Sequence, residues 1–254
     1  MEIPTSHPRY QSLLFREKII EGLYSKVVTE AGLFAHGRGE SLDYFLGEKS
    51  EDFSFAAARA AAASLLLAER PVISVNGNAA ALVSEELVAL AQAVNAKLEV
   101  NLFYRAHGRE EAIERVLRAA GALEVLGVGA AASATIPEIQ HERRRVDPRG
   151  ILVADVVLVP LEDGDRTEAL VNMGKTVLTI DLNPLSRTAQ KSHVTVVDNI
   201  VRALPHMIQA ANELRNQAPE VIKAAAQWNN AHGLARALRF YSERLNFLAQ
   251  SLEG

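Results

Sequence analysis

The chain has 254 residues, of which 48% are hydrophobic and 23% are charged, a composition typical of soluble globular proteins. It has no cysteine, which excludes disulfides, thiolate metal sites and a cysteine nucleophile, and its net charge of −4 argues against nucleic acid as a partner. No apolar run reaches transmembrane length and the N-terminus does not resemble a signal peptide, so we expect no membrane association and a cytoplasmic location.

The first third of the chain is predicted to be mostly helical. Ser6 is a suitable cap for a helix whose apolar residues, up to Leu23, recur at helical spacing. The segment 31–40 contains three glycines and is expected to interrupt the helical pattern. Another helix, rich in alanine and leucine, is expected over residues 53–69.

From residue 71 onward, short apolar stretches alternate with helical patterns. Strands are predicted at 71–75, 97–103, 123–128, 151–159, 175–180 and 194–197, and helices at 84–95, 109–121, 165–173 and 199–216. Such alternation is typical of a parallel α/β sheet with helices on both faces. We therefore expect one domain, 1–254, with helical extensions; the helical tail 219–254 can pack on the sheet or form a dimer contact.

Polar residues follow several of the predicted strands, at the edge where α/β proteins bind ligands. Asp181, Leu182 and Asn183 end one strand, and a carboxylate there can accept both hydroxyls of a ribose. Arg187 follows at a distance suited to a phosphate. A solvated turn with a locally bonded Asp is the alternative interpretation.

The next acidic motif precedes a predicted helix. Glu162, Asp163 and Asp165 share one turn, and carboxylates at that density suit Mg²⁺. The alternative is a helix start, because acidic residues favour that position and Asp165 with Glu168 resembles a capping box.

Further polar segments allow both functional and structural interpretations. The glycine in 76–78 permits close approach of an anion to a helix start, and 36–40 combines glycines with Arg38, which can bind a phosphate bidentately. Both segments are also compatible with plain turns or loops. The basic run 141–145 lacks the second histidine of a zinc protease and is interpreted as a solvated face.

Residues 127–132 match the glycine pattern of dinucleotide-binding proteins. Pro137 interrupts the helix that should follow, and the nearest suitably spaced acid, Asp147, lies in a predicted loop. A turn without a ligand is favoured, and an NAD-dependent reductase is kept as the less favoured alternative.

Taken together, the motifs resemble the archaeal 4-phosphopantoate–β-alanine ligase (phosphopantothenate synthetase) family. The resemblance rests on SHPRY (6–10), REKIIEG (16–22), AHGRGE (35–40), SVNGN (74–78), NLFYR (101–105), HERRRVD (141–147), ADVVLVPLEDGDRTEALVNMGK (154–175), DLNPLSRTA (181–189) and VDNIVRA (197–203). It implies a Rossmann-like three-layer fold, a homodimer, and the joining of 4-phosphopantoate to β-alanine with cleavage of ATP to AMP, in coenzyme A biosynthesis.

The resemblance also carries over site residues. The positions implied to contact ATP are Arg16, Arg38, Asp181, Leu182, Asn183, Arg187, Thr188, Asn199 and Ile200. Mg²⁺ is expected to neutralise the departing pyrophosphate, with Asp163 and Asp165 as candidate ligands.

The remaining roles are hypotheses from position. Asn76, Asn101 and Arg105 lie at strand ends and are expected to bind phosphopantoate. His36 or Glu162 is expected to take the proton of the amine, and the sequence does not decide between them. A non-catalytic adenine-nucleotide sensor is the main alternative function.

Overall fold

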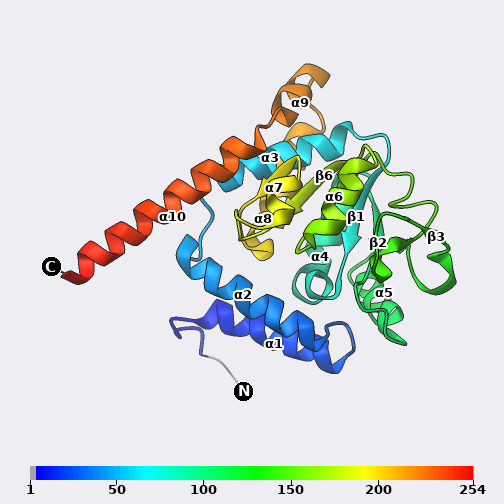
Figure 1. The fold of residues 1–254 in the computed structure, drawn as a ribbon, viewed down its shortest axis with the longest axis horizontal. Coiled ribbons are helices and arrows are strands. Elements are labelled where there is room, and N and C mark those ends of the chain that lie inside the picture. Colours follow the sequence, from blue (N-terminus) through cyan, green and yellow to red (C-terminus); the bar gives the residue numbers. More distant parts are fainter. Residues whose placement is uncertain (1–3, 254) are drawn as a thin grey trace.

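A five-stranded parallel sheet forms the centre of the computed structural model, which describes residues 4–253 (Figure 1). The strands are β1 (Pro71–Val75), β2 (Lys97–Val100), β5 (Val156–Leu158), β6 (Thr176–Ile180) and β7 (Val194–Val196), in the spatial order β2-β1-β5-β6-β7. The fold is α/β and three-layered, as predicted, and it lies within the Rossmann-like class.

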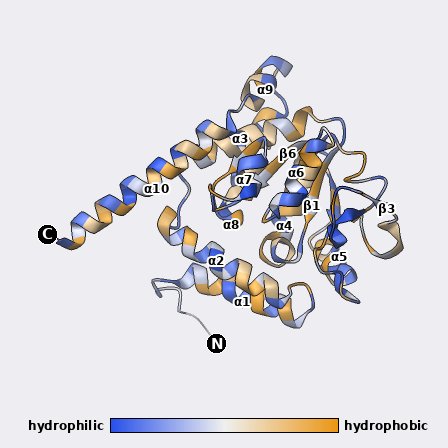
Figure 2. Ribbon diagram, viewed as in Figure 1, coloured by the Kyte–Doolittle hydropathy of each residue, from blue (hydrophilic) through white to orange (hydrophobic). Residues whose placement is uncertain are grey.

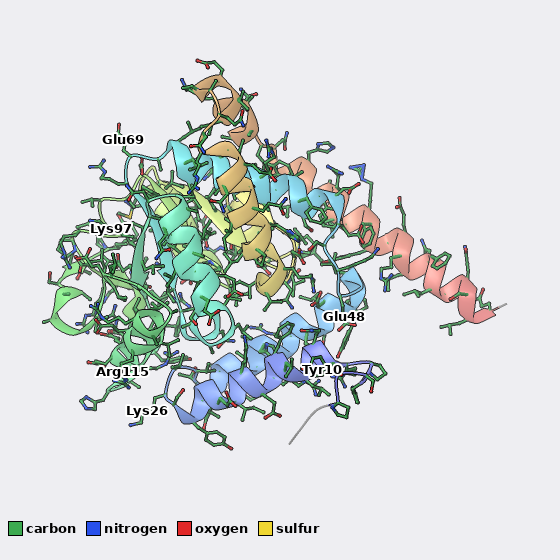
Figure 3. The ribbon with its side chains drawn as sticks, turned by 180° about the vertical axis from the view of Figure 1, so that it is seen from behind. Tyr10, Lys26, Glu48, Glu69, Lys97 and Arg115 are labelled. Carbon is green, nitrogen blue, oxygen red and sulfur yellow. The ribbon has the colours of Figure 1, made fainter. Side chains whose placement is uncertain are left out.

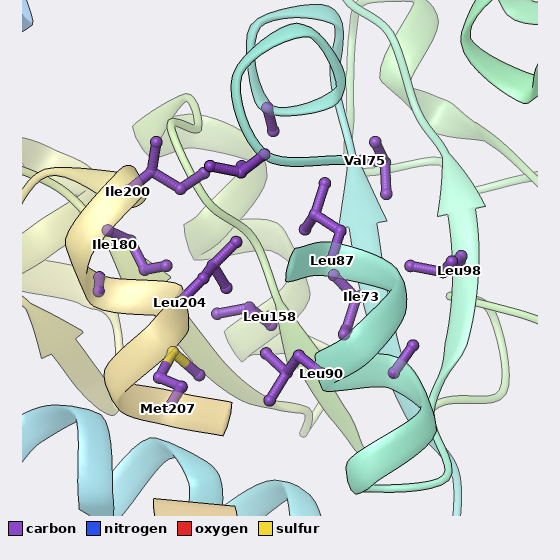
Figure 4. Close-up of a cluster of buried hydrophobic side chains, with 14 of the residues drawn as sticks. Ile73, Val75, Leu87, Leu90, Leu98, Leu158, Ile180, Ile200, Leu204 and Met207 are labelled. Atoms are coloured by element: carbon purple, nitrogen blue, oxygen red, sulfur yellow. The ribbon is translucent and has the colours of Figure 1, made fainter. Parts of the chain in front are cut away.

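Successive strand residues alternate between two apolar clusters, as expected for side chains that point to opposite faces of a sheet. Ile73 and Leu158 pack against α3 (Asp52–Leu67), α4 (Gly77–Ala93) and α8 (Ile200–Leu214). Figure 4 shows this cluster with Leu87, Leu90, Leu204 and Met207 from the helices.

Val72 and Val157 face the other way, towards α6 (Gly164–Asn172) and the segment 136–151. Because both faces are covered, β1 and β5 are buried along their whole length and are mostly apolar, which is why the sequence predicted them as strands.

The connection between β2 and β5 is largely irregular. It contains α5 (Arg109–Ala119), two short 3₁₀ turns, η1 (Gly129–Ala131) and η2 (Glu142–Arg144), and a small antiparallel pair, β3 (Ala134–Thr135) with β4 (Arg145–Val146). After β6 comes the short helix α7 (Arg187–Lys191).

Two helical extensions flank the sheet. At the N-terminus, α1 (Tyr10–Tyr24) and α2 (Glu30–Leu46) lie side by side (Figure 1), and Figure 3 shows them from behind, below α4 and α8. At the other end of the chain, α9 (Pro219–Ala226) packs on α3, and α10 (Asn230–Glu253) projects away from the body. Figure 2 shows hydrophilic and hydrophobic residues alternating along α10. Within residues 4–253, no helix has the length and apolarity needed to cross a membrane.

The predicted interruption at residues 31–40 is wrong, because this segment forms the middle of α2. Glycine disfavours a helix by about 1 kcal/mol relative to alanine, so local propensity alone points to a break. Packing overrides it at Gly32, where an added Cβ would clash with the side chain of Asn78 on α4 and would lie 2.7 Å from Val28. The glycine therefore lets the two helices approach each other.

Several element boundaries also differ from prediction. The first helix begins at Tyr10, and Ser6 does not cap it. The helix expected from residue 84 begins at Gly77, with a kink at Val83 where φ is −144° and ψ is 38°. The strands expected at 123–128 and 151–159 are reduced to one bridge at Leu126 and to β5.

Candidate active site

A cleft of about 940 Å³ lies between the α1–α2 pair and the carboxyl edge of the sheet. Its walls come from α1, α2 and the segments that follow β1, β2, β5, β6 and β7. This is the edge at which open α/β sheets bind their ligands.

Most of the residues singled out from the sequence meet in this cleft. Its lining includes His36, Arg38, Asn76, Glu162, Asp163, Asp181, Leu182, Asn183, Arg187, Thr188, Asn199 and Ile200. Four others, Arg16, Asn101, Arg105 and Asp165, are not part of the lining.

The helices α4, α6 and α8 start at the cleft. Asn76 caps α4 by accepting a hydrogen bond from the backbone N–H of Ala79 at 3.0 Å, and Asn199 caps α8 through the N–H of Val201 at 3.3 Å. Gly164, the first residue of α6, also lines the cleft. The free N–H groups and the dipoles of these helices favour a bound anion.

Asp181 closes β6 and faces the cleft. Its carboxylate accepts hydrogen bonds from the Asn183 N–H, at 2.8 Å, and from the Ser186 hydroxyl. Burial raises the pKa of Asp181, while these hydrogen bonds and the charge of Arg38 oppose the rise. A carboxylate with each oxygen already fixed by one donor is held in place yet keeps lone pairs for the hydroxyls of a ligand.

The three arginines expected to contact ATP differ in their surroundings. Arg38 is exposed in the cleft and forms no ion pair or hydrogen bond with residues 4–253. Arg187 pairs with Glu168 beside the start of α6, where an added Cβ at Gly164 would lie 2.5 Å from the Cβ of Arg187. Arg16 lies outside the cleft and binds both oxygens of Glu40, at 2.8 and 2.9 Å. Arg38 is therefore the cation best placed to meet a phosphate directly.

His36 and Glu162 both line the cleft but differ in availability. Burial lowers the pKa of His36, so its ring is neutral at pH 7, and its buried Nε2 has no hydrogen-bond partner among the described residues. The Glu162 side chain is 1% exposed and pairs with Arg143, at 2.6 Å, and with Arg166. Of the two candidates, the geometry favours His36 as a proton acceptor.

The residues predicted to bind phosphopantoate have protein partners. The amide nitrogen of Asn76 donates to the Pro160 carbonyl at 2.9 Å, and that of Asn101 donates to the carbonyls of Arg143 and Arg145 at 3.1 Å. Arg105, with a side chain 5% exposed, pairs with Glu110 at 2.5 Å. Their assignment to phosphopantoate stays a prediction, and the contacts seen are structural.

A magnesium site made by the protein alone does not fit this arrangement. Within residues 4–253, no three His, Cys, Asp or Glu side chains are grouped to hold a metal ion. Asp163 Oδ2 lies 3.1 Å from Arg143 Nε, and Asp165 Oδ2 lies 3.2 Å from His141 Nε2. Mg²⁺ therefore stays a prediction; an ion carried by nucleotide phosphates needs only one or two protein carboxylates.

The dinucleotide pattern at residues 127–132 forms only the turn η1, and no helix follows it within residues 132–141. The pattern therefore lacks the helix start that would bind a pyrophosphate.

Sequence reasoning missed several polar residues of the cleft. The run 141–145 was interpreted as a solvated face, yet Arg143 is 7% exposed and lines the cleft. Arg109, also 7% exposed, was not singled out. Asp43 and Arg202 join α2 to α8 at the cleft. No local pattern pointed to Arg109 or Asp43. Arg143 and Arg202 do occur in HERRRVD and VDNIVRA, two of the motifs that carry the family resemblance.

The sequence is similar to those of known proteins over almost its whole length. The model of the phosphopantothenate/pantothenate synthetase family matches residues 53–244. The 4-phosphopantoate–β-alanine ligases of Thermococcus kodakarensis and Thermococcus onnurineus are 52% and 53% identical to this chain over 252 residues, which cover 98% of the chain and 96% of each relative. The ligase of that name from Methanosarcina mazei is 50% identical over 249 residues, covering 98% of this chain and 97% of the relative. The chain belongs to the phosphopantothenate/pantothenate synthetase family.

Proposed function

We propose that this chain is an ATP-dependent, AMP-forming ligase that joins (R)-4-phosphopantoate to β-alanine and makes 4′-phosphopantothenate for coenzyme A biosynthesis. The observation that carries the proposal is the 50–53% identity, over 98% of the chain, to relatives named for this reaction. The cleft supports it, because Arg38, Asp181 and Arg187 line one cavity large enough for more than one ligand.

The chemistry requires activation of a carboxylate, since oxide is a poor leaving group. An oxygen of the substrate carboxylate attacks the α-phosphorus of ATP, and the bond to pyrophosphate breaks. The amine nitrogen of β-alanine then attacks the acyl carbon, AMP leaves, and the nitrogen loses a proton. Catalysis of these steps rests on positioning and on stabilisation of developing charge.

The nucleotide is assigned to the β6–β7 side of the cleft. Asp181 accepts the ribose hydroxyls, and Arg38 and Arg187 bind the phosphates over the starts of α6 and α8. Leu182, Asn183, Thr188, Asn199 and Ile200 complete this wall. Arg16 acts indirectly in this arrangement, because it fixes Glu40 on α2, one turn from His36.

His36 is the assigned proton acceptor for the amine. Its neutral ring and unpartnered buried Nε2 meet the requirement that a base be deprotonated and free to accept. Mg²⁺ is proposed to enter with ATP and to offset charge on the pyrophosphate.

We also propose that the chain forms a homodimer through α10. Leu245, Leu248 and Leu252 recur at a spacing of three and four residues on the projecting part of this helix, and they are 43%, 38% and 88% exposed. A second copy of the same helix would cover this apolar stripe.

Mass spectrometry of complete and incomplete reactions tests the function. Repeated turnover to AMP, pyrophosphate and 4′-phosphopantothenate is expected only when ATP, 4-phosphopantoate and β-alanine are all present; without β-alanine, at most one pyrophosphate per active site should be released. A nucleotide sensor would bind ATP and release no pyrophosphate under any combination. Oxidation of NADH to NAD⁺, matched by reduction of one of the organic substrates, would instead support the reductase alternative.

A further inference from the structure

Arg109 is a buried cation of the cleft that pairs with no carboxylate among the described residues. Arg109, the first residue of α5, is 7% exposed and lines the cavity. Its Nη1 donates to the Tyr104 carbonyl at 2.6 Å and its Nη2 to the Val27 carbonyl at 3.1 Å. Its Nε is buried without a partner, and no carboxylate within residues 4–253 pairs with it.

The charge of Arg109 is not offset by the charged residues around it. Burial and the nearby Arg143 lower the pKa of Arg109 to about 10, so it remains charged at neutral pH. Arg143, itself 7% exposed, shares Glu162 with the fully buried Arg166 and lies beside Asp163. Arg143 and Arg166 therefore have carboxylate partners, with Glu99 also near Arg166, whereas Arg109 has none among the described residues. A buried charge is costly unless it is paired.

The start of α4 adds to this charge. An added Cβ at Gly77 would lie 2.6 Å from Arg109 Nη2, so the guanidinium sits against the first residue of α4. Gly77 and Asn78 both line the cavity. Backbone N–H groups beside a buried arginine that has no carboxylate partner favour a bound anion.

This anion site is separate from the nucleotide residues along the sheet edge. Arg109 follows β2 and Gly77 follows β1, whereas Asp181 and Asn199 follow β6 and β7. The strand order β2-β1-β5-β6-β7 puts these two groups at opposite sides of the cleft. A nucleotide whose phosphates bind at the β6–β7 side does not occupy the β1–β2 side, which remains available to a second phosphorylated ligand.

We propose that Arg109 and Arg143, with the start of α4, bind the phosphate of the acid substrate and give the enzyme its preference for 4-phosphopantoate over unphosphorylated pantoate. The inference rests on the proposed ligase function and assigns the substrate phosphate to residues different from those expected from the sequence. A phosphate dianion offsets the unpaired charge of Arg109 and accepts hydrogen bonds from Arg109 Nε and the α4 N–H groups.

The first test is steady-state kinetics of Arg109→Gln with the full chain. The kcat/KM for 4-phosphopantoate is expected to fall roughly 10- to 100-fold through KM, the loss of hydrogen bonds to a charged group. The KM for ATP should stay unchanged, and inhibition by inorganic phosphate against 4-phosphopantoate should weaken in parallel. Arg118→Gln is the matched control, because Arg118 lies on the same helix and is paired with Glu114 outside the cleft.

A wild-type KM for 4-phosphopantoate in Arg109→Gln, or an equal rise in the KM for ATP, would overturn the inference. If the wild type forms 4′-phosphopantothenate but Arg109→Gln behaves like it, only the Arg109 assignment fails. If the wild type forms no product, the ligase proposal itself fails. If Arg109→Gln does not fold, a crystal structure of the wild type with 4-phosphopantoate decides: its phosphorus is expected beside the Arg109 guanidinium, and a phosphorus located elsewhere refutes the assignment.

Discussion

Asp43 on α2 accepts two hydrogen bonds from Arg202 on α8, at 2.6 and 3.1 Å, and so ties the N-terminal helical pair to the sheet domain. The same carboxylate accepts the amide of Asn199, the cap of α8, at 2.8 Å. Arg202 is held in turn by Asp198, at 2.7 Å. The two walls of the cleft are therefore joined directly beside Asn199, which we assign to the nucleotide site.

Asp43→Ala should separate these walls. The substitution removes the three hydrogen bonds that Arg202 and Asn199 donate to this carboxylate. Because Arg202 keeps Asp198 as a partner, we expect the loss of unfolding free energy to be roughly 3 kcal/mol. Urea unfolding measures the loss, and hydrogen exchange should quicken in α2. The control is Arg59→Ala, which breaks a pair to Glu213 with both side chains about half exposed and should cost less than about 1 kcal/mol. Equal losses in the two variants would contradict the proposed tie.

Asp181→Asn should weaken recognition of the ribose. An amide offers one acceptor oxygen where the carboxylate offers two, so ATP affinity is expected to fall about tenfold. Calorimetry with ATP and with 2′,3′-dideoxy-ATP isolates the contact, because the variant should bind the two equally while the wild type prefers ATP. Arg38→Gln provides the comparison. It should lower the affinity for ATP and for the dideoxy analogue by the same factor, because a contact with a phosphate does not depend on the ribose hydroxyls. A variant at 181 that still prefers ATP would place the ribose elsewhere.

His36→Gln should remove the acid limb of the pH profile. Burial lowers the pKa of His36 below its usual 6.5, so the ring stays neutral as the pH falls to 6.5. The kcat/KM for β-alanine should therefore fall only at a pH below 6.5. Loss of a positioned base typically costs roughly 100-fold in rate. His232→Gln, an exposed histidine on α10, should leave the profile unchanged. An acid limb that persists in His36→Gln would identify another group as the base.

His36 should also make the unfolding free energy of the protein depend on pH, in a direction set by its lowered pKa. A histidine whose native pKa is lowered binds protons less tightly when folded, so it lowers the unfolding free energy as the pH falls through its usual range. The variant His36→Gln should therefore lose less stability than the wild type between pH 7 and 5. Thermal unfolding at both pH values measures the difference.

The sheet and the location of the cleft were predictable because they follow from local patterns. Continuous β-branched runs such as 176–180 identify strands buried on both faces, and polar residues after parallel strands must meet at one edge. The helix α2 was not predictable in the same way, because Gly32 is explained by its contact with Asn78, 46 residues away in sequence.

The roles of individual arginines were predictable only in part. Arg105 and Arg109 are four positions apart and both are largely buried, yet Arg105 pairs with Glu110 while Arg109 pairs with no carboxylate within residues 4–253. Burial and pairing depend on the tertiary fold, so a position at a strand end does not separate a structural cation from a ligand-binding one.

Arg105→Ala tests that distinction. Removing the partner of Glu110 leaves a buried carboxylate unpaired, so we expect a loss of roughly 3 kcal/mol in unfolding free energy. The KM for 4-phosphopantoate should stay at the wild-type value, in contrast to Arg109→Gln. A raised KM with unchanged stability would instead restore the sequence-based assignment of Arg105 to this substrate.

Leu248→Glu should dissociate the proposed dimer. Leu245, Leu248 and Leu252 lie beyond the part of α10 that packs on the body, where Leu234 and Ala237 are buried. In a twofold interface each substitution acts twice, and burial of a leucine contributes roughly 1.5–3 kcal/mol, so the dissociation constant should rise at least about 100-fold. Sedimentation velocity across a concentration series measures it. Gln250→Glu introduces the same charge at an exposed position of the same helix and should leave the association intact. A monomeric wild type, or a Leu248→Glu dimer of unchanged affinity, would show that a second copy does not cover this stripe.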